Sequence, residues 1–491
     1  MVFNSYTFIV FFLVMLLLHN LPFSWKVKKI NLLIASYLFY AAWNPPFILL
    51  LWLSTVVDFY VGKALFTQEN KYKKKLLLVI SLIGNLGMLC FFKYGTFILE
   101  NFTLLVNLVG FDFHPAKPNI ILPAGISFYT FTTLCYTIDM YYKKSEPVKS
   151  MLDFSLFVTF FPHLVAGPIV RPPQLVPQFE HPKQATMQQL MQGLLLLSLG
   201  LFMKVVLADS MLAESANKVF DSKDVLSTLD AWMGVLAFSG QIFCDFAGYS
   251  TCAIGVAACL GFILPHNFLY PYAAIGFSDF WRRWHITLSA WLRDYLYIPL
   301  GGNRSGLFRS YLNIMITMLL GGLWHGANWT FVVWGALHGL YLWGEKTILY
   351  FRNKKVPTAD AEVVISEKSG SGEKVMRKTF RNFMLAMVTF FFINVTWVFF
   401  RAQDFSTAWR LLTSMFYQAP DAKTLLHTMS MVKICIITTG LISFHWMMRN
   451  TLVLQVVEKM SWWLLAFFWS LILILLILSQ ESSSSFIYFQ F

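Results

Sequence analysis

The chain has 491 residues, of which 57% are hydrophobic and 13% charged, and its formal net charge is +13. About a quarter of the residues in soluble domains are charged, so this composition excludes an ordinary soluble protein and indicates an integral membrane protein. Nucleic acid is disfavoured as a partner, because apolar segments separate the clusters of positive charge from one another.

Candidate membrane spans recur along the whole chain, since about 20 apolar residues suffice to cross a bilayer. Two longer regions, 30–62 and 121–169, contain prolines and are expected to form hairpins or re-entrant pieces that protein or water shields. We therefore expect an all-α polytopic protein with roughly ten to thirteen crossings. The apolar segments lie near 4–22, 30–43, 46–62, 75–93, 121–139, 151–166, 188–208, 231–263, 311–322, 329–350, 382–400, 431–448 and 462–479.

The first apolar segment has no basic region before it and no small-residue cleavage site after it, so we expect a retained helix rather than a signal peptide. Clustered lysine and arginine mark cytoplasmic loops. If the loop with Lys26, Lys28 and Lys29 is cytoplasmic, both chain termini lie on the outer side. The polar interval 352–381 is expected to be a cytoplasmic loop within a single membrane domain over 1–491.

The six cysteines lie mostly inside apolar segments and show neither CxxC nor His-paired spacing. This distribution is typical of small packing residues, so we expect neither disulfides nor metal ligands, and no metal site is predicted. The cysteines are Cys90, Cys135, Cys244, Cys252, Cys259 and Cys435.

The segment 279–304 is basic, rich in tryptophan and too polar for a lipid-exposed span, and its spacing predicts one amphipathic helix. Such a helix is typical of a membrane-surface anchor whose arginines reach lipid phosphates, but an anchor does not account for His285. A phosphate-rich ligand such as coenzyme A is the alternative partner, held by Arg282, Arg283 and Arg304. The apolar side carries Trp281, Trp284, Leu288 and Trp291, and the basic side carries Arg282, Arg283, Ser289 and Arg293.

The stretch 319–339 sets polar residues among glycines and aliphatics, and polar groups inside a membrane usually face a cavity. Asn328 and Trp329 follow His325 by three and four positions, so we expect all three on one helix face that lines a water-accessible lumen. A neutral imidazole can take a proton from a hydroxyl near neutral pH. Beside a bound thioester, His325 would therefore activate an acceptor hydroxyl for attack on the acyl carbon.

Glycines in the same stretch, Gly321, Gly322 and Gly326, leave room for a ligand or a neighbouring helix to approach. For the other membrane histidines, His338 and His445, an interhelical hydrogen bond is an equal alternative to chemistry. The chain has no GxSxG, HExxH, P-loop or GxGxxG motif that would indicate another reaction.

Two blocks of sequence carry a family resemblance: FWRRWHITLSAWLRDYLYIPLGGNR at 280–304 and LLGGLWHGANWTFVVWGALHG at 319–339. They resemble the membrane-bound O-acyltransferases, in particular the bacterial proteins of alginate O-acetylation, and fit the branch that transfers D-alanine to lipoteichoic acid less well. The one departure is Thr287, where a serine is expected. Further agreement, over most of the chain from residue 120 onward, comes from LPAGISFYTF (122–131), FFPHLVAGPIVRPPQLVPQF (160–179), CDFAGYS (244–250) and FIYFQF (486–491).

This resemblance implies a ring of tilted transmembrane helices around a central tunnel, closed by re-entrant loops and short cytoplasmic helices. It also implies that His325 is the catalytic base and that His285 is a second catalytic residue beside it, on the cytoplasmic side. Weaker candidates for the tunnel or for donor binding are Trp324, Asn328, Asp279, Arg282, Arg283 and Arg293, with Asp245 and His163 weaker still.

The activity that the resemblance implies is O-acetyl transfer from cytoplasmic acetyl-CoA, a co-substrate rather than a bound cofactor, in a bacterial inner membrane with both termini periplasmic. A periplasmic partner, an SGNH-type acetyltransferase with a Ser-His-Asp site, would then esterify an exported polysaccharide such as alginate, peptidoglycan or cellulose. Two alternatives stay open: a transporter that moves the acetyl donor or a carrier without bond chemistry, and a structural subunit of a polysaccharide secretion complex. Membrane lipid is a partner in each case.

Overall fold

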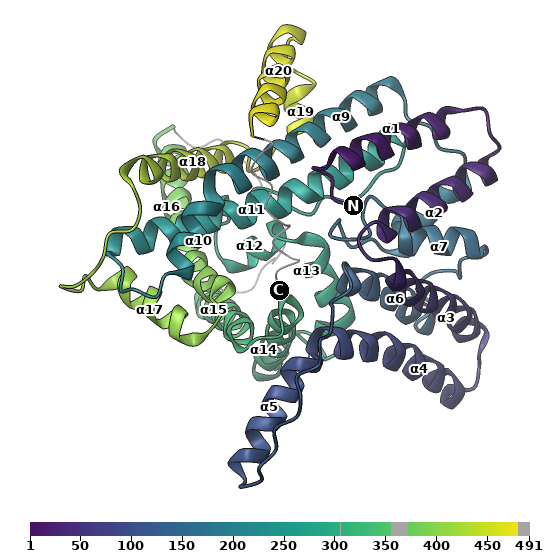
Figure 1. The fold of residues 1–491 in the computed structure, drawn as a ribbon, viewed down its shortest axis with the longest axis horizontal. Coiled ribbons are helices and arrows are strands. Elements are labelled where there is room, and N and C mark those ends of the chain that lie inside the picture. The colour runs from purple at the N-terminus through teal and green to yellow at the C-terminus, as the bar shows by residue number, and fades with distance from the viewer. Residues whose placement is uncertain (305, 355–371, 480–491) are drawn as a thin grey trace. The chain divides into compact units, whose positions relative to one another are not determined.

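The computed structural model is all-helical, apart from one isolated bridge, in the residues that it describes, which are 1–304, 306–354 and 372–479. The helices are α1 to α20, most of them labelled in Figure 1, and short 3₁₀ and π segments connect or continue them. The chain divides into two compact units. Unit 1 comprises Met1–Ser210, Phe243–His266 and 461–479, and unit 2 comprises the described parts of Met211–Ile242 and Asn267–Met460.

Seven helical segments of the described chain are long and apolar enough to cross a membrane, and two further apolar helices are shorter. The expectation of roughly ten to thirteen crossings exceeds this count of candidate spans and stays a prediction. Part of the difference arises at 121–139 and 151–166, which form the buried helices α6 (Ile126–Tyr141) and α7 (Met151–Thr159), of 16 and 9 residues. The seven segments are Pro45–Thr67, Lys71–Leu108, Met187–Asp221, Thr228–Cys259, Gly306–His325, Thr379–Arg401 and Thr428–Met447.

Helices near the start of the chain form one packed group in unit 1. Here α3 (Ile48–Thr67) contacts α4 (Lys71–Leu89) and α6, while α2 (Trp25–Ala41) contacts α1 (Tyr6–Asn20) and α7. A turn that begins with two prolines separates α2 from α3, because proline cannot continue a preceding helix. The predicted break within 30–62 is therefore confirmed.

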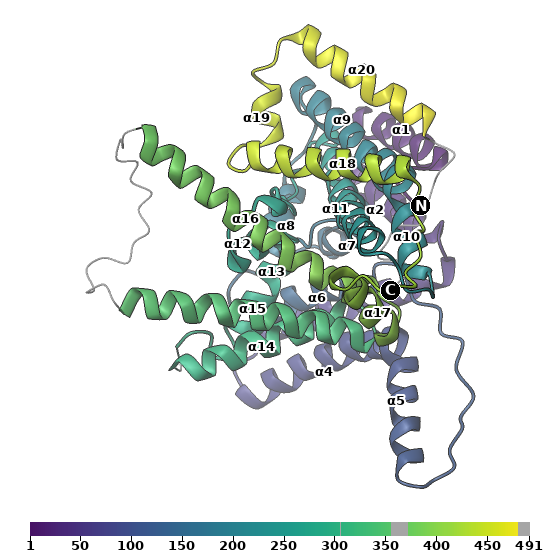
Figure 2. The same ribbon diagram turned by 90° about the vertical axis from the view of Figure 1, so that its left-hand side faces the viewer.

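Glycines permit a close crossing of two other helices in unit 1. α9 (Met187–Leu201) crosses the later part of α11 (Thr228–Cys259), where a Cβ at Gly200 would lie 2.6 Å from the Gly248 carbonyl oxygen. Only glycine permits this approach, so the crossing depends on both residues. In Figures 1 and 2, α5 (Gly95–Leu108) projects away from the neighbouring α4. The remaining helices of unit 1 are α8 (Pro172–Glu180) and α20 (Trp462–Leu478).

Unit 2 contains a hairpin of α14 (Gly306–His325) and α15 (Trp329–Lys354), which lie side by side in Figures 1 and 2. A Cβ at Gly322 would lie 2.3 Å from the Phe331 carbonyl oxygen, so the two backbones touch at this glycine. This contact confirms the expectation that glycines of 319–339 admit a neighbouring helix.

Other helices of unit 2 pack against this hairpin, and α12 contacts α15. Among them, α16 packs on α15 and on α17. The polar interval 352–381 falls mostly on 355–371, which lies outside the described residues, while its two ends belong to α15 and α16. The further helices are α10 (Glu214–Asp221), α12 (Phe277–Arg283), α13 (Ile286–Leu292), α16 (Gly372–Arg401), α17 (Phe405–Phe416), α18 (Thr428–Met447) and α19 (Val453–Val457).

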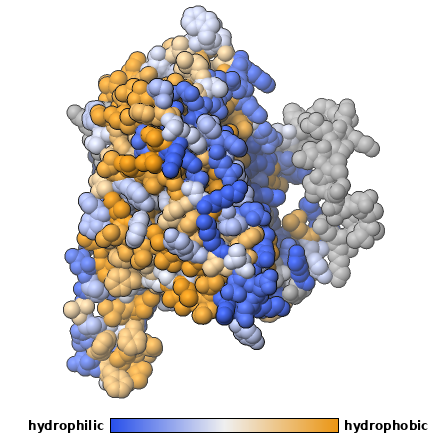
Figure 3. Space-filling view, turned by 90° about the vertical axis from the view of Figure 1, so that its right-hand side faces the viewer, coloured by the Kyte–Doolittle hydropathy of each residue, from blue (hydrophilic) through white to orange (hydrophobic). Residues whose placement is uncertain are grey.

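Apolar side chains are abundant on the surface as well as in the interior. Leu13, Leu49 and Ile83 are 60%, 69% and 67% exposed. Figure 3 shows broad hydrophobic areas on the face that it displays. Such surface is costly in water and favourable against lipid chains, which agrees with a protein that crosses the membrane several times.

Candidate active site

His285 lies at a break between two short helices. α12 ends at Arg283, α13 begins at Ile286, and His285 has a left-handed backbone with φ 42° and ψ 55°. This conformation costs a non-glycine residue about 1–3 kcal/mol, so other contacts must hold it. Leu269 N–H donates to the Arg283 carbonyl at 2.9 Å, and Ile286 N–H donates to the Asn267 carbonyl at 2.9 Å. These two bonds flank His285 and fix its backbone.

The prediction of one amphipathic helix over 279–304 is therefore wrong, because the helix is interrupted at His285. The predicted separation of two sides is confirmed in part: the apolar side is buried and Arg282 and Arg293 are exposed, whereas Arg283 and Ser289 are half-buried. Tryptophans of a membrane-surface anchor would face lipid headgroups, so their burial inside the protein argues against that interpretation. Trp281, Trp284, Leu288 and Trp291 are 9%, 1%, 0% and 8% exposed.

The His285 side chain is fully buried and lies against Trp324, with 5.9 Å between the ring centroids. Its Nδ1 lies 3.1 Å from the Oδ1 atom of Asn267. Burial lowers the pKa of His285 to about 3, because a charged imidazole loses its hydration there. The ring is therefore neutral at physiological pH.

His325 is the last residue of α14 and packs among aromatic rings. Its ring centroid lies 5.0 Å from the ring centroids of Trp324 and Trp334 and 5.3 Å from that of Phe400, and the residue is 2% exposed. Trp324 thus contacts both His325 and His285. We call these five residues, His285, Trp324, His325, Trp334 and Phe400, the histidine cluster.

The prediction that His325, Asn328 and Trp329 share a helix face is wrong. α14 ends at His325, α15 begins at Trp329, and the residues between them are not helical. Asn328 caps the second helix instead, because its Oδ1 accepts a hydrogen bond from Thr330 N–H at 3.0 Å. Its Nδ2 donates to the Gln403 carbonyl at 2.7 Å. Asparagine is favoured here because its side chain satisfies an N–H group that the start of a helix leaves open.

Hydrogen bonds account for the two other histidines considered from the sequence. His338 Nε2 lies 3.2 Å from Thr396 Oγ1, which joins α15 to α16. His445 Nδ1 accepts a hydrogen bond from Tyr272 N–H at 3.2 Å. Of the two equal alternatives, these contacts favour the structural one.

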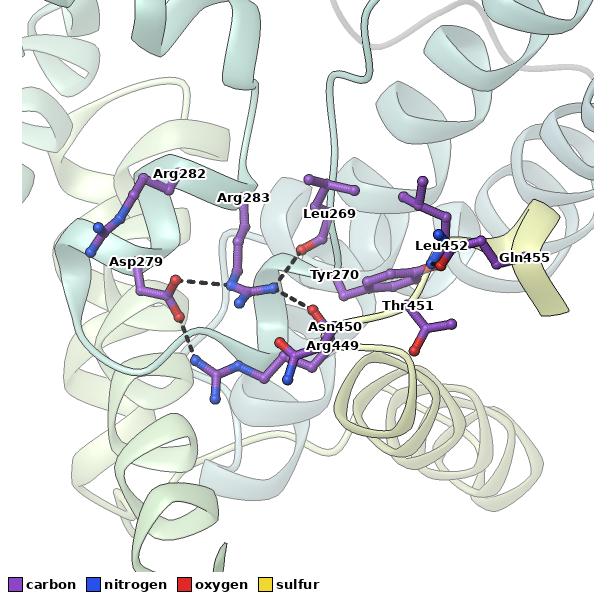
Figure 4. A pocket seen from close by; sticks show the side chains of 10 residues that line it. All are labelled: Leu269, Tyr270, Asp279, Arg282, Arg283, Arg449, Asn450, Thr451, Leu452 and Gln455. Carbon is purple, nitrogen blue, oxygen red and sulfur yellow. Dashed lines mark hydrogen bonds and ion pairs between the residues drawn. The ribbon is translucent and has the colours of Figure 1, made fainter. Parts of the chain in front are cut away.

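Asp279 holds two arginines from distant parts of unit 2. Its Oδ1 lies 3.0 Å from Arg283 Nε, and its Oδ2 lies 2.8 Å from Arg449 Nη2 (Figure 4). Ile275 N–H also donates to Oδ2, at 2.9 Å. Burial alone would raise the pKa of Asp279, but the Ile275 N–H and the two arginines outweigh burial and hold the pKa below its usual range. The carboxylate is therefore ionised at physiological pH.

A pocket of about 330 Å³ opens beside this network (Figure 4). Its lining includes three arginines and one aspartate, which give a formal charge of +2. Such a lining suits an anion, and arginine matches phosphate or carboxylate oxygens especially well. Arg304, which was also expected to meet a phosphate, is not among its residues. The pocket is lined by Leu269, Tyr270, Asp279, Arg282, Arg283, Arg449, Asn450, Thr451, Leu452 and Gln455.

The remaining candidates lie outside both the cluster and the pocket. Arg293 is exposed, and its Nε pairs with Asp294 Oδ1 at 2.7 Å. Asp245 belongs to unit 1, where its Oδ1 lies 2.6 Å from Lys204 Nζ. His163 is a buried residue of unit 1.

Sequence reasoning missed Asn267, Trp334, Phe400 and Arg449. Trp334 stands within the 319–339 block, nine positions after His325, so it could have been included from that block alone. Arg449 is 170 residues from Asp279, and no spacing signal joins residues so far apart. Asn267 and Phe400 likewise gain their importance only from the fold.

Comparison with known proteins identifies the family. A model described as MBOAT, membrane-bound O-acyltransferase family, matches residues 7–368. The chain belongs to the membrane-bound O-acyltransferase family. This membrane-bound O-acyltransferase is an acyl-transfer enzyme that crosses the membrane several times, so the resemblance seen in the two sequence blocks is confirmed.

Named relatives agree with this assignment. Probable alginate O-acetylase AlgI from Azotobacter vinelandii is 38% identical over 418 residues, which cover 85% of this chain and 78% of that protein. Peptidoglycan O-acetyltransferase from Helicobacter pylori is 38% identical over 414 residues, which cover 79% of this chain and 73% of that protein. Teichoic acid D-alanyltransferase from Streptococcus thermophilus is 28% identical over 263 residues, or 50% and 63% of the two chains. The weaker likeness to the teichoic acid branch is confirmed.

Proposed function

We propose that this enzyme transfers acetyl groups from cytoplasmic acetyl-CoA to a hydroxyl acceptor, and so supplies the O-acetylation of an exported polysaccharide such as alginate or peptidoglycan. The names of two relatives, an alginate O-acetylase and a peptidoglycan O-acetyltransferase, support acetyl as the transferred group. The observation that carries the chemistry is the contact of both His285 and His325 with Trp324. It brings two imidazoles together in a buried setting where bulk water is excluded.

His325 is the proposed general base. Its neutral imidazole accepts the proton of the acceptor hydroxyl as the hydroxyl oxygen attacks the thioester carbonyl carbon. The C–S bond of the tetrahedral intermediate then breaks, and the imidazolium returns the proton to the departing CoA thiolate. The products are an acetyl ester and CoA with a free thiol. Because His325 is only 2% exposed, the surrounding aromatic rings must move to admit the acceptor.

His285 is proposed to orient a substrate rather than to take its proton. Its pKa of about 3 makes it a weak base. A neutral imidazole can still accept a hydrogen bond, and so can hold an O–H or N–H group of a bound substrate in place. Its contact with Trp324 keeps this group in the same cluster as His325.

The arginine pocket is the proposed site of the donor's phosphates. Its charge of +2 follows from Arg282, Arg283 and Arg449 against Asp279, and CoA carries several phosphate groups. The Arg283 carbonyl accepts from Leu269 N–H in the same pair of segments that flanks His285. The pocket residues Leu269 and Arg283 therefore belong to the same two backbone segments that hold His285. This side of the protein is proposed to face the cytoplasm, where CoA is found.

The exported polymer lies beyond the membrane, so a periplasmic SGNH-type O-acetyltransferase is the proposed partner that completes the ester. Both chain termini are proposed to lie on that side of the inner membrane. Co-purification of the two proteins from membranes, with acetylation lost when either gene is deleted, is the expected result.

A turnover assay with purified enzyme and acetyl-labelled acetyl-CoA tests the proposal. We expect His325→Ala to lower CoA release by at least about 100-fold, the usual effect of removing a general base. His427→Ala, at an exposed histidine of the same unit, is the matched control and should keep normal turnover. Normal CoA release by His325→Ala would refute the assigned role. Uptake of intact acetyl-CoA into vesicles without thioester cleavage would instead support the transporter alternative.

A further inference from the structure

We propose that Asn267 is a positioning residue that fixes His285 in the tautomer with its proton on Nδ1, so that Nε2 carries the lone pair and can accept a hydrogen bond from the substrate. The inference rests on the proposed function, in which His285 orients a substrate group. It adds a residue outside the two sequence blocks, and it assigns which ring nitrogen of His285 donates a hydrogen bond and which accepts one.

The first step is the orientation of the Asn267 amide. Asn267 is 1% exposed, and its Oδ1 lies 3.3 Å from the backbone nitrogen of Thr287 and 2.9 Å from Thr287 Oγ1. A backbone N–H can only donate a hydrogen bond. The side-chain atom that faces it must therefore be the amide oxygen and not the amide nitrogen, which removes the usual ambiguity of an asparagine flip.

The second step places the proton of His285. Its Nδ1 lies 3.1 Å from the same Asn267 Oδ1, which can only accept. Nδ1 must therefore donate. A neutral imidazole carries one N–H, so its lone pair is on Nε2. Burial supports this assignment, because it keeps the ring in its neutral form.

Asn267 also holds this segment through a backbone hydrogen bond. The Asn267 carbonyl accepts from Ile286 N–H at 2.9 Å, while its side chain bonds to His285 and Thr287. One buried asparagine thus contacts all of residues 285–287. The left-handed backbone of His285 lies at the centre of this contact.

His338 provides an internal reference of the opposite kind. Its Nε2 lies 3.2 Å from Thr396 Oγ1, and that hydroxyl donates its own proton to the Ile393 carbonyl at 2.7 Å. The hydroxyl can then only accept from His338, so His338 carries its proton on Nε2. The two buried histidines are therefore expected to show opposite tautomers in one spectrum.

The assignment has a mechanistic consequence. With the lone pair on Nε2, His285 cannot donate a hydrogen bond to the oxyanion of a tetrahedral intermediate. It can accept one from a hydroxyl or amide group of a substrate. Its contribution is therefore to orientation, which in enzymes is often set by groups outside the reacting atoms.

Solid-state NMR of the full-length enzyme in lipid, labelled with ¹⁵N-histidine, tests the tautomer directly. The His285 signals are identified by their loss in His285→Gln, and the His338 signals by their loss in His338→Gln. We expect His285 to show a protonated Nδ1 and a bare Nε2. A protonated Nε2 with a bare Nδ1 would overturn the inference. The tautomer is read in the unaltered enzyme, and the two variants serve only to assign its signals.

Kinetics of Asn267 variants test the positioning role. We expect Asn267→Ala to lower kcat about 10- to 100-fold, as removal of an orienting partner commonly does, with the KM for acetyl-CoA unchanged. Asn267→Asp keeps the acceptor oxygen and should restore the Nδ1–H signal. Its carboxylate also raises the pKa of His285, so the pH profile of kcat should move to higher pH. Normal kcat in Asn267→Ala would contradict the inference.

The outcomes separate this inference from the proposed function. If His285→Gln keeps full turnover, His285 has no part in the reaction and the proposed function of that residue fails. If His285→Gln loses turnover while Asn267→Ala keeps it, His285 matters but Asn267 does not position it.

Discussion

Asp279 is a small acid among three arginines, and its two oxygens bind two of them. Without it, Arg283 and Arg449 would keep their charges at close range with no shared counterion. Like charges held together oppose folding, whereas the carboxylate lets the pocket remain cationic and still assembled. The residue therefore serves the shape of the pocket more than its affinity for a ligand.

We expect Asp279→Asn to lower the melting temperature at neutral pH. The folded pKa of Asp279 is lowered, so the carboxylate stabilises the fold above its unfolded pKa of about 3.9. That contribution is lost as the pH falls through the still lower folded pKa. The difference in Tm between wild type and variant should stay constant above about pH 5 and shrink below about pH 4, by thermal unfolding in detergent. A difference that widens on acidification would contradict this role.

Arg282 differs from its neighbour Arg283 in being exposed at the pocket, where its Nε contacts only the Ser278 carbonyl among the hydrogen bonds described. We expect Arg282→Ala to raise the KM for acetyl-CoA about tenfold, the size of one charge-assisted hydrogen bond, and to leave kcat near normal. Steady-state kinetics at fixed ionic strength measures this. Arg293→Ala, at an exposed arginine outside the pocket, is the matched control, and equal effects of the two variants would sink the assignment.

At the scale of elements, the α14–α15 hairpin determines where His325 lies. Gly322 and Gly335 allow the two backbones to touch, since a Cβ at Gly335 would lie 2.3 Å from the Met318 carbonyl oxygen. Backbone atoms cannot yield as a flexible side chain can. A larger residue at either glycine must therefore separate the helices and shift the end of α14.

We expect Gly322→Ala to lower both Tm and turnover, because its new methyl group meets the Phe331 carbonyl oxygen. Gly344→Ala is the control on α15, where a Cβ meets nothing within 4 Å. Alanine is the better helix former by about 0.5–1 kcal/mol, so this control should be neutral or stabilising. Unchanged turnover in Gly322→Ala would show that the close contact is not needed.

The sequence alone was enough for some of these elements and not for others. Asn328 stands between a glycine and a new apolar run, which is a readable capping signal, and the helix break there could have been predicted. The break at His285 could not, because helical spacing continues through it and the left-handed backbone depends on hydrogen bonds to residues 267–269. Local pattern specifies elements, whereas tertiary bonds decide where this one is interrupted.

At the scale of the whole molecule, the composition predicted the membrane class and the two sequence blocks predicted the family. The predicted number of crossings exceeds the seven candidate spans of the described chain, because an apolar stretch such as 151–166 can be buried in protein as well as in lipid. Hydropathy does not distinguish these two environments. The pairing of Asp279 with Arg449 could not be predicted from the sequence for a different reason, since it joins segments that are distant in the chain.

Sidedness is a property of the whole protein that follows from the proposed donor. CoA cannot cross a bilayer unaided, so in reconstituted vesicles only molecules with the arginine pocket outward should use external acetyl-CoA. An epitope inserted in 355–371, predicted to be cytoplasmic, reports that orientation through an impermeant antibody. We expect the active fraction before permeabilisation to equal the antibody-accessible fraction. Activity confined to the inaccessible fraction would reverse the topology.

The left-handed backbone at His285 makes this position suitable for a chemical-rescue experiment. Glycine accepts that conformation without penalty, so His285→Gly would delete an imidazole and relax its support at the same time. The space left beside Asn267 has the size of the missing ring. Imidazole supplied in the buffer would then occupy the vacancy. If it restores turnover, the imidazole ring is what the reaction needs at this position, and its covalent attachment to the backbone is not.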